Sequence, residues 1–548
     1  MNLPFNLSPW RTKLRLRSEA KAQVTARGSS RKKAPIKLGL PIFMMIVAVL
    51  CGLIMGLGSI QYAILIVAII VAPLVLLMQS TTLIAWLLVV SMIVAGCLQY
   101  FARVEQAHWM PFLILAVMLA RVPLDAMRAA KPGERSDGVD LLGFLLIAFV
   151  VLVFASALVN KNPPMQALVG VKQYVFPLAL TAAVTLAVAP REFWLKVWRS
   201  IPWFLIAQLP LCLYQYLFVE KGTSTAFGAT GIAWDAVVGS FGGNPEGGGA
   251  SGALALFLCF GIASNLALLR SQQISPRLAW LSNAAAMASI FLAEVKVVVI
   301  FLPLALLILN RAKVLKSAVS AAAWLLATLA FVVGLLLVYQ VLHYSNKQTG
   351  SKSLSEIFEF ATKAEQDTYT YNRETGELSR TGALKTWSQE NIGRGRLVES
   401  LVGYGPAASK GFSSMFGKGT VARKYVFQLQ TSSASTVLWD LGVVGGGLVA
   451  AIFVLAFVRS LSLAKRLAAD PPLSALAESC AVAIALTGSG YLYNNASVNV
   501  SSVQLLASLA IGMVFVLTRF AKKQAFLPAV SSQVKVVKRQ VFRPRIGT

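Results

Sequence analysis

Long apolar stretches alternate with short polar segments along most of the chain. Many of the stretches are close to 20 residues long, the number of helical residues that crosses a hydrocarbon core of about 30 Å. They are continuously apolar, which favours helices over the alternating strands of a membrane barrel. We predict an all-α, polytopic transmembrane helical bundle of about 12–14 spans, at 38–57, 60–78, 81–100, 107–122, 141–159, 166–188, 198–218, 249–269, 277–293, 295–310, 317–342, 433–458, 474–493 and 502–518. The short pair within 277–310 also fits one broken helix.

Basic residues in the short connections predict an orientation. Residues 11–37 are rich in cations and lead into the first apolar run without a persuasive cleavage site, which indicates a cytoplasmic tail, not a signal peptide. With that start, nearly every basic connection falls on the cytoplasmic side, as the positive-inside rule requires. Both termini are therefore expected in the cytoplasm, with basic tails at 1–37 and 519–548.

Composition supports a membrane protein and argues against several other classes. The chain is 57% hydrophobic and 13% charged, with a mean hydropathy of +0.68. Much of its net charge of +28 lies in the two tails, where contact with anionic membrane lipids accounts for it without nucleic acid. The five cysteines all lie in apolar runs, and no metal-ligand spacing or carboxylate cluster occurs. We expect no metal and no cofactor.

One polar insertion, at 343–432, separates the transmembrane helices of 38–342 from those of 433–518. It carries about a dozen Lys and Arg residues on the side predicted to be periplasmic. Cations are normally biased toward the cytoplasm, so their number here indicates an anionic ligand. Guanidinium groups match phosphate oxygens in a bidentate way, and the candidates are Arg380, Arg394 and Arg396. The alternative is a solvated loop whose cations pair with its own acids, among them Glu390 and Glu399.

Three further outer segments contain polar residues in apolar surroundings. Glu294 and Lys296 interrupt an apolar hairpin, and Lys172 lies near an outer helix end. Ionisable groups in spans are functional candidates, and the very apolar flanks of Glu294 and Lys296 favour this over the alternative, snorkelling at the interface. The Gly-rich run around Asn244 either shapes an anion-binding turn before a helix or is a flexible linker.

The order of several motifs resembles that of the O-antigen polymerase/ligase superfamily of integral membrane glycosyltransferases. These motifs are Lys172-Gln-Tyr-Val-Phe-Pro177, Gln215-Tyr216, Gly239-Ser-Phe-Gly-Gly-Asn-Pro245, the charged break, Arg380 to Trp387, Gly403-Tyr-Gly-Pro406 and Trp439-Asp-Leu-Gly-Val-Val-Gly445. The resemblance covers roughly residues 160 to 460.

The resemblance implies a donor in which an oligosaccharide is carried on undecaprenyl diphosphate. The glycan would be transferred to a hydroxyl outside the cytoplasmic membrane, beneath a partly helical periplasmic lid. It implies diphosphate or glycan-phosphate contacts from Lys172, Lys296, Arg380, Arg394 and Arg396. Glu294, Glu390 and Glu399 become acid/base or sugar-hydroxyl candidates, Tyr404 and Trp387 become candidates for stacking on sugars, and Asn244 becomes a substrate contact. A chain-length regulator and a flippase are the partner proteins it implies.

Two departures favour one branch of this family. The ligase branch is expected to have a His near the start of the helix after the loop, where this chain reads Thr431-Ser-Ser-Ala-Ser-Thr436. The charged break reads Glu294-Val-Lys296, where many relatives have Ser-Arg. We therefore expect a repeat-unit polymerase for exopolysaccharide, capsule or O-antigen. The alternatives are an O-antigen ligase that acts on lipid A core, a transporter or flippase for a lipid-linked glycan, and an assembly protein.

Overall fold

The computed structural model describes residues 78–129, 140–220, 236–243, 250–343, 371–372, 377–413 and 416–541. The helices predicted at 38–57 and 60–78 lie outside these residues, as do Asn244 and residues 344–370 of the insertion. The described part is almost entirely helical, so the predicted helical class is confirmed.

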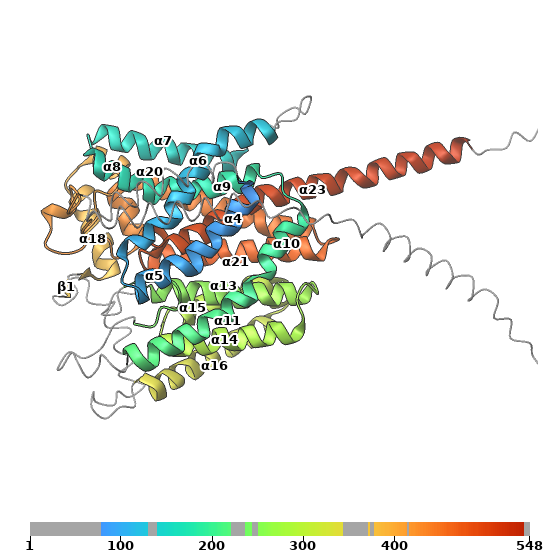
Figure 1. Cartoon of the computed structure of the whole chain (residues 1–548), viewed down its shortest axis with the longest axis horizontal. Coiled ribbons are helices and arrows are strands. Elements are labelled where there is room, and N and C mark those ends of the chain that lie inside the picture. The colour runs from blue at the N-terminus through green and yellow to red at the C-terminus, as the bar shows by residue number, and fades with distance from the viewer. Residues whose placement is uncertain are drawn as a thin grey trace, which may run out of the picture. The chain divides into compact units, whose positions relative to one another are not determined.

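The described helices run side by side along the horizontal direction of Figure 1, and α18 lies at one end of them. In the first half of the chain the elements are α4 (Ser80–Val89), η1 (Val90–Val94), α5 (Ala95–Phe101), η2 (Glu105–Trp109), α6 (Met110–Ala129), α7 (Leu141–Val159), α8 (Pro164–Tyr174), α9 (Phe176–Leu186), α10 (Arg191–Arg199), α11 (Ile201–Tyr214), η3 (Gln215–Glu220) and α13 (Ser251–Arg270). The remaining elements are α14 (Pro276–Ala293), α15 (Val298–Val314), α16 (Ala318–His343), β1 (Tyr371–Asn372), β2 (Glu377–Leu378), α18 (Arg380–Asn391), α19 (Leu397–Val402), η4 (Ala422–Lys424), α20 (Ser433–Arg466), α21 (Pro471–Tyr493), α22 (Ala496–Asn499) and α23 (Ser501–Val541).

Nine of the described helices are long and apolar enough to cross a membrane, and the bent pair α8–α9 makes up to ten. This supports a multi-pass membrane protein. The predicted pair at 277–293 and 295–310 forms two separate helices, α14 and α15, which are not among these nine. They are separated at Glu294, whose left-handed backbone (φ 50°) ends α14.

The segment predicted as one helix at 166–188 is bent. The axes of α8 and α9 differ by 40°. Pro177 explains the break, because it has no N–H to donate to the Gln173 carbonyl four residues earlier. The Gln504 side chain of α23 donates to that carbonyl instead, with an Nε2–O distance of 3.0 Å.

Connections rich in arginine meet at one end of the bundle, called the basic end below. There Arg191 pairs with Asp470 at 2.7 Å, and Arg311 pairs with Glu478 at 3.4 Å. Arg459, near the end of α20, pairs with Asp140, which precedes α7. The turns that the sequence assigns to the cytoplasm therefore share one end of the bundle.

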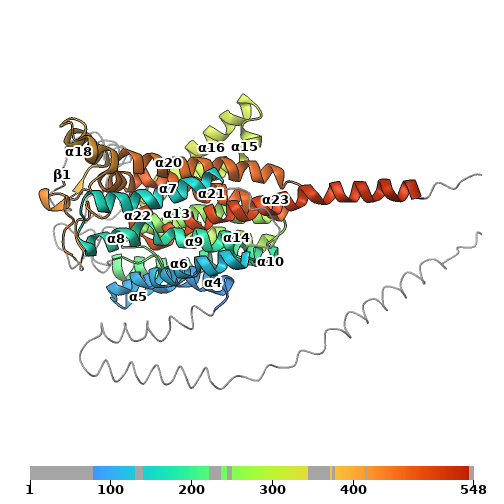
Figure 2. The same ribbon diagram turned by 90° about the horizontal axis from the view of Figure 1, so that it is seen from above.

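The described part of the insertion lies at the opposite end, called the loop end below (Figures 1 and 2). It has a small core of its own, separate from the main core of the bundle. This second core consists of Trp387, Ala408, Val421, Leu429 and Trp439, with aromatic residues packed around it. Because Trp439 belongs to α20, the insertion is anchored to a helix of the bundle.

Candidate anion-binding site

A fully buried carboxylate, Asp440, holds the insertion against the bundle. Its Oδ2 accepts hydrogen bonds from the Tyr174 hydroxyl (2.8 Å) and the Ala407 amide (3.0 Å), and its Oδ1 accepts from the Ser409 amide (2.8 Å). A buried carboxylate is tolerated when such donors surround it, and each charge-assisted bond contributes about 1.5–3 kcal/mol. Asp440 thus joins α20, α8 and the segment 407–409.

The segment that follows α19 can pack closely against α20 because glycines, which have no Cβ atom, occupy the points of contact. Gly403 has φ 71°, and a Cβ there would lie 2.4 Å from the Asp440 backbone. Gly442, with φ 67°, interrupts α20 directly opposite, and a Cβ there would lie 2.3 Å from the Leu401 carbonyl oxygen. Two backbones therefore cross at contact distance, which only glycine permits at these positions.

Helix α8 contacts the same segment from its other side. A Cβ on Gly170 would lie 2.3 Å from Pro406 Cβ, and the Gln166 side chain donates to the Pro406 carbonyl. Gln166 also accepts a hydrogen bond from the Thr420 amide (3.1 Å). These contacts fix the position of Lys410 relative to α8.

Two lysines lie at this junction, Lys172 on α8 and Lys410 after the Asp440 contacts. Lys172 is 8% exposed, and its Nζ lies 3.8 Å from the ring centre of Trp109 and 4.6 Å from that of Phe112. The positive charge of Lys410 acts on Lys172. Burial lowers the pKa of Lys410, and the neighbouring Asp440 carboxylate opposes that shift.

The charge of this junction is unbalanced. The Asp440 carboxylate already accepts hydrogen bonds from Tyr174 and two backbone amides. It also acts on Lys410, and the charge of Lys410 acts on Lys172. Partly buried like charges repel each other, and an anion between them would relieve the repulsion. The site is therefore suited to bind an anionic group at the end of the helices.

The remaining predicted cations lie in other surroundings. Arg380 begins α18, and its guanidinium lies 4.2 Å from the ring centre of Tyr493. Tyr493 also packs against Phe301 of α15, one turn into the helix that follows Lys296. Glu294 and Lys296 are both half-buried in the break between α14 and α15. Arg380 and this break therefore share the loop end of the bundle.

A third group surrounds the far end of α18. Arg394 pairs with Glu390 at 2.8 Å, and Arg396 donates to the Tyr404 hydroxyl at 3.0 Å. That hydroxyl donates to Asn391 Oδ1 at 2.8 Å. A 12-residue helix is about 18 Å long, so Arg380 and this group lie at opposite ends of α18. The five predicted cations therefore do not form one cluster in the structure.

Two predicted sugar contacts have structural partners. Trp387 is 5% exposed in the second core, and its indole N–H donates to the Leu438 carbonyl at 3.0 Å. Tyr404 is half-buried, with its ring centre 5.8 Å from that of Trp439. Trp387 therefore serves as a core residue, and stacking on sugars remains a prediction for the more accessible Tyr404. Glu399 lies in the first turn of α19.

Asp440, Tyr174 and Lys410 are not among the predicted site residues, although Tyr174 and Asp440 lie within two of the motifs quoted above. Asp440 carried a usable signal, because an ionisable residue in an apolar stretch directly after the insertion is a functional or structural candidate. Lys410 carried none, since it is one of about a dozen cations in the insertion. Its neighbours are defined only by the fold.

No protein-family model matches this chain, and no curated protein is significantly similar to it.

Proposed function

We propose that this protein is a membrane glycosyltransferase that polymerises oligosaccharide repeat units carried on undecaprenyl diphosphate. The reaction would take place at the loop end, on the periplasmic side of a bacterial inner membrane. The observation that carries the proposal is the junction at which Lys172 of α8 lies within electrostatic range of Lys410 of the insertion. The order of motifs described above supports the same activity.

The residues of the junction are suited to stabilise a diphosphate leaving group. Negative charge develops on that group as the glycosidic bond breaks, and fixed cations stabilise it most where water is excluded. Lys172 is held against two aromatic rings, and Lys410 follows directly on a segment fixed by Asp440. The Lys172 side chain and the backbone that carries Lys410 would thus be positioned before the substrate arrives, which reduces reorganisation during the reaction.

The entry to α20 favours a polymerase over a ligase. Ser432 and Ser435 form a capping box, Ser435 Oγ also donates to the Leu429 carbonyl, and Thr436 Oγ1 donates to the Ser432 carbonyl. These hydroxyls satisfy backbone groups at the start of the helix. The stretch in which a ligase is expected to have its His therefore has a structural role here.

Reconstituted protein tests the proposal. Liposomes that contain the protein and lipid-linked repeat units should produce a ladder of increasing chain length on a gel. We expect Lys172→Met and Lys410→Met each to lower the initial rate about 100-fold, the usual cost of removing one fixed donor at a developing charge. Transfer of a single block to a different acceptor would indicate a ligase instead.

Matched variants separate this site from the rest of the insertion. Lys418→Met removes the same charge from an exposed position and should change the rate less than about twofold. Arg394→Gln and Arg396→Gln, at the far end of α18, should each cost less than tenfold, because Arg394 lies in an exposed ion pair and Arg396 donates to a neutral hydroxyl. Full activity of a Lys172→Met/Lys410→Met double variant would contradict the proposed site.

A further inference from the structure

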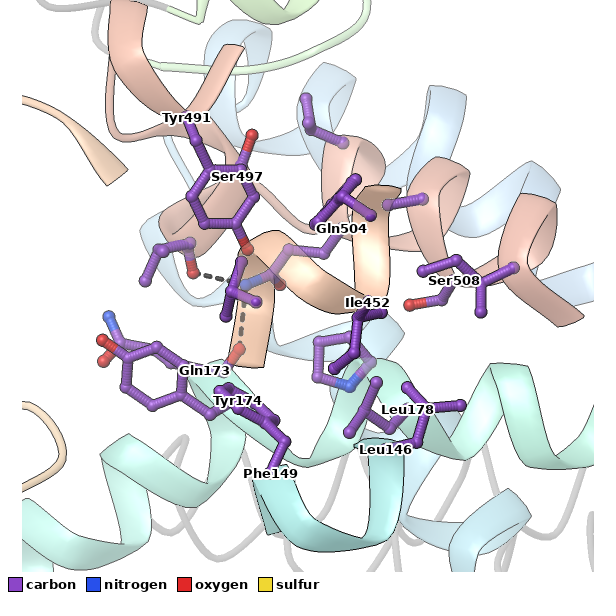
Figure 3. Close-up of a pocket in the computed structure, with 17 residues that line it drawn as sticks. Leu146, Phe149, Gln173, Tyr174, Leu178, Ile452, Tyr491, Ser497, Gln504 and Ser508 are labelled. Carbon is purple, nitrogen blue, oxygen red and sulfur yellow. Dashed lines mark hydrogen bonds between the residues drawn. The ribbon is translucent and has the colours of Figure 1, made fainter. Parts of the chain in front are cut away.

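A pocket of about 70 Å³ lies where α7, the α8–α9 bend, α20, α21 and α23 meet. Its lining has two parts (Figure 3). Gln173, Tyr491, Ser497 and Gln504 gather at one end, and Leu146, Leu178 and Ile452 lie at the other. The pocket is therefore amphipathic, with a hydrogen-bonding end and an aliphatic end.

The polar end contains two hydrogen-bond acceptors that receive no hydrogen bond from the described residues. Gln173 and Gln504 are each 5% exposed. The Gln173 Nε2 group donates to Asn499 Oδ1, and the Gln504 Nε2 group donates to the Gln173 carbonyl. Both Oε1 atoms are buried without a hydrogen-bond partner in the described part of the chain. A buried unsatisfied acceptor is costly, so this end is suited to a ligand with an O–H donor.

Ordered water alone cannot fill the whole pocket, because one end of the lining is mainly aliphatic. A buried water needs two to four polar partners, whereas Leu146, Leu178 and Ile452 offer none and Ser508 beside them offers one hydroxyl. Nearby residues on α7 and α20 are apolar and exposed, with Ile147 at 55% and Val454 at 62%. In a membrane these surfaces would contact lipid chains, so an alkyl chain can continue from the pocket along the two helices.

The size of the pocket limits how much of a ligand enters. A cavity of about 150 Å³ holds a benzene molecule. At about 70 Å³ this pocket admits only a hydroxyl group and the first few carbons of a chain. A bulky or charged head group would not fit.

We propose that this pocket binds the hydroxyl end of a long-chain lipid alcohol, with the Gln173 and Gln504 side-chain oxygens as acceptors. The inference does not depend on the glycosyltransferase activity, because the pocket is defined by residues other than Lys172 and Lys410. Its occupant would link α20, α21 and α23 to the α8–α9 bend.

Photo-crosslinking with two matched probes tests the proposal. One probe is a 16-carbon primary alcohol with a diazirine near the hydroxyl, and the other is its methyl ether, which lacks only the donor. Delipidated full-length protein in detergent is irradiated with each, and labelled peptides are identified by mass spectrometry. We expect the alcohol to label the 446–456 and 503–511 segments about fivefold or more above the ether, the effect of one hydrogen bond.

Two variants locate the label. Ala507→Trp fills the pocket and should abolish the preference for the alcohol, whereas Leu325→Trp, at a site 69% exposed on α16 away from the pocket, should leave it unchanged. Gln504→Met removes one acceptor and gives a second test if the tryptophan variant does not elute as folded protein. Equal labelling by both probes, or labelling that persists in a folded Ala507→Trp variant, would overturn the proposal.

Discussion

At the residue scale, the donors and acceptors around a buried charge decide its role. Asp440 is fully buried and accepts hydrogen bonds from Tyr174 and from two backbone amides. The Nζ of Lys172 lies over the rings of Trp109 and Phe112, and the like charge of Lys410 acts on it. The carboxylate therefore fixes the structure, whereas the lysines can attract a ligand.

Replacing Asp440 by Asn should destabilise the protein. An NH₂ group would replace one carboxylate oxygen. It cannot accept the hydrogen bond that this oxygen received, so a buried donor would lose its partner. We expect a loss of about 1–3 kcal/mol in the free energy of unfolding, measured as a lower midpoint of thermal unfolding in detergent.

An acidic residue at the basic end provides the control. Asp140 pairs with Arg459, whose hydrogen bond holds the pKa of Asp140 below its usual range, and the Asp140 side chain is 43% exposed. Exposed ion pairs contribute about 0–1 kcal/mol, so Asp140→Asn should have a much smaller effect than Asp440→Asn. Equal losses from the two variants would contradict the role given to Asp440.

The protonation of Lys410 should depend on its surroundings. Burial lowers its pKa from the usual value of 10.5, and Asp440 partly opposes this. Its charge is present at low pH and is lost as the pH rises through the lowered pKa. Because only the neutral amine is acetylated, Lys410 should react with acetic anhydride at a lower pH than an unstructured lysine peptide.

The same experiment has an internal check. Asp440→Asn removes the carboxylate that raises the pKa of Lys410, so the midpoint of acetylation should move to a still lower pH. A midpoint at or above that of the peptide would show that Lys410 is not buried as described.

At the scale of the elements, two breaks in helices position the candidate site. Pro177 bends α8 away from α9, and Gly442 interrupts α20 beside the segment that contains Gly403. Each break frees backbone groups that another element satisfies: Gln504 donates to the Gln173 carbonyl, and the Gly405 amide donates to the Asp440 carbonyl at 2.9 Å. The breaks are therefore parts of the packing between elements.

Alanine at Gly442 should be strongly destabilising. Its φ of 67° is strained for any residue with a side chain, and the new Cβ would lie 2.3 Å from the Leu401 carbonyl oxygen. We expect a cost of at least about 1–3 kcal/mol from the backbone strain alone, seen as a lower unfolding midpoint and faster trypsin cleavage after Lys410.

Gly447 in the same helix is the matched control. It has a helical backbone, and a Cβ there meets no atom within 4 Å. Ala in place of Gly within a helix is favourable by about 1 kcal/mol, so Gly447→Ala should leave stability unchanged or raise it. If Gly447→Ala were less stable than Gly442→Ala, the break in α20 would be refuted.

At the scale of the whole molecule, charge is distributed between the two ends of the bundle. The basic end carries the arginines of the short turns, several of them paired with acids or side-chain amides. The loop end carries Lys172, Lys410 and the cations of the insertion. This division agrees with an orientation in which the basic end faces the cytoplasm.

Cysteine labelling tests that orientation. Arg423 and Lys313 are exposed at the loop end and the basic end, respectively, and every native cysteine lies in an apolar run. We expect Arg423→Cys to react with a membrane-impermeant maleimide on intact spheroplasts. Lys313→Cys should react only after the membrane is permeabilised, and the opposite pattern would invert the proposed orientation.

Much of the fold follows from the sequence because helix length and apolarity are local properties. All predicted helices from 81 onward occur, although 166–188 is bent and α14 and α15 differ from full spans. The candidate site follows less well. Arg380, Arg394 and Arg396 are all cations of the insertion, yet α18 separates the first from the other two.

The sequence by itself determined the helical class, the approximate helix positions and the division of charge between loops, since each depends on composition over a short window. Only the tertiary structure decided which of the many cations are buried and which residues face one another. Lys410 lies within electrostatic range of Lys172 and Asp440 because glycines at 403 and 442 let two backbones touch, a contact between segments far apart in the chain. Such contacts depend on packing, and no local pattern specifies them.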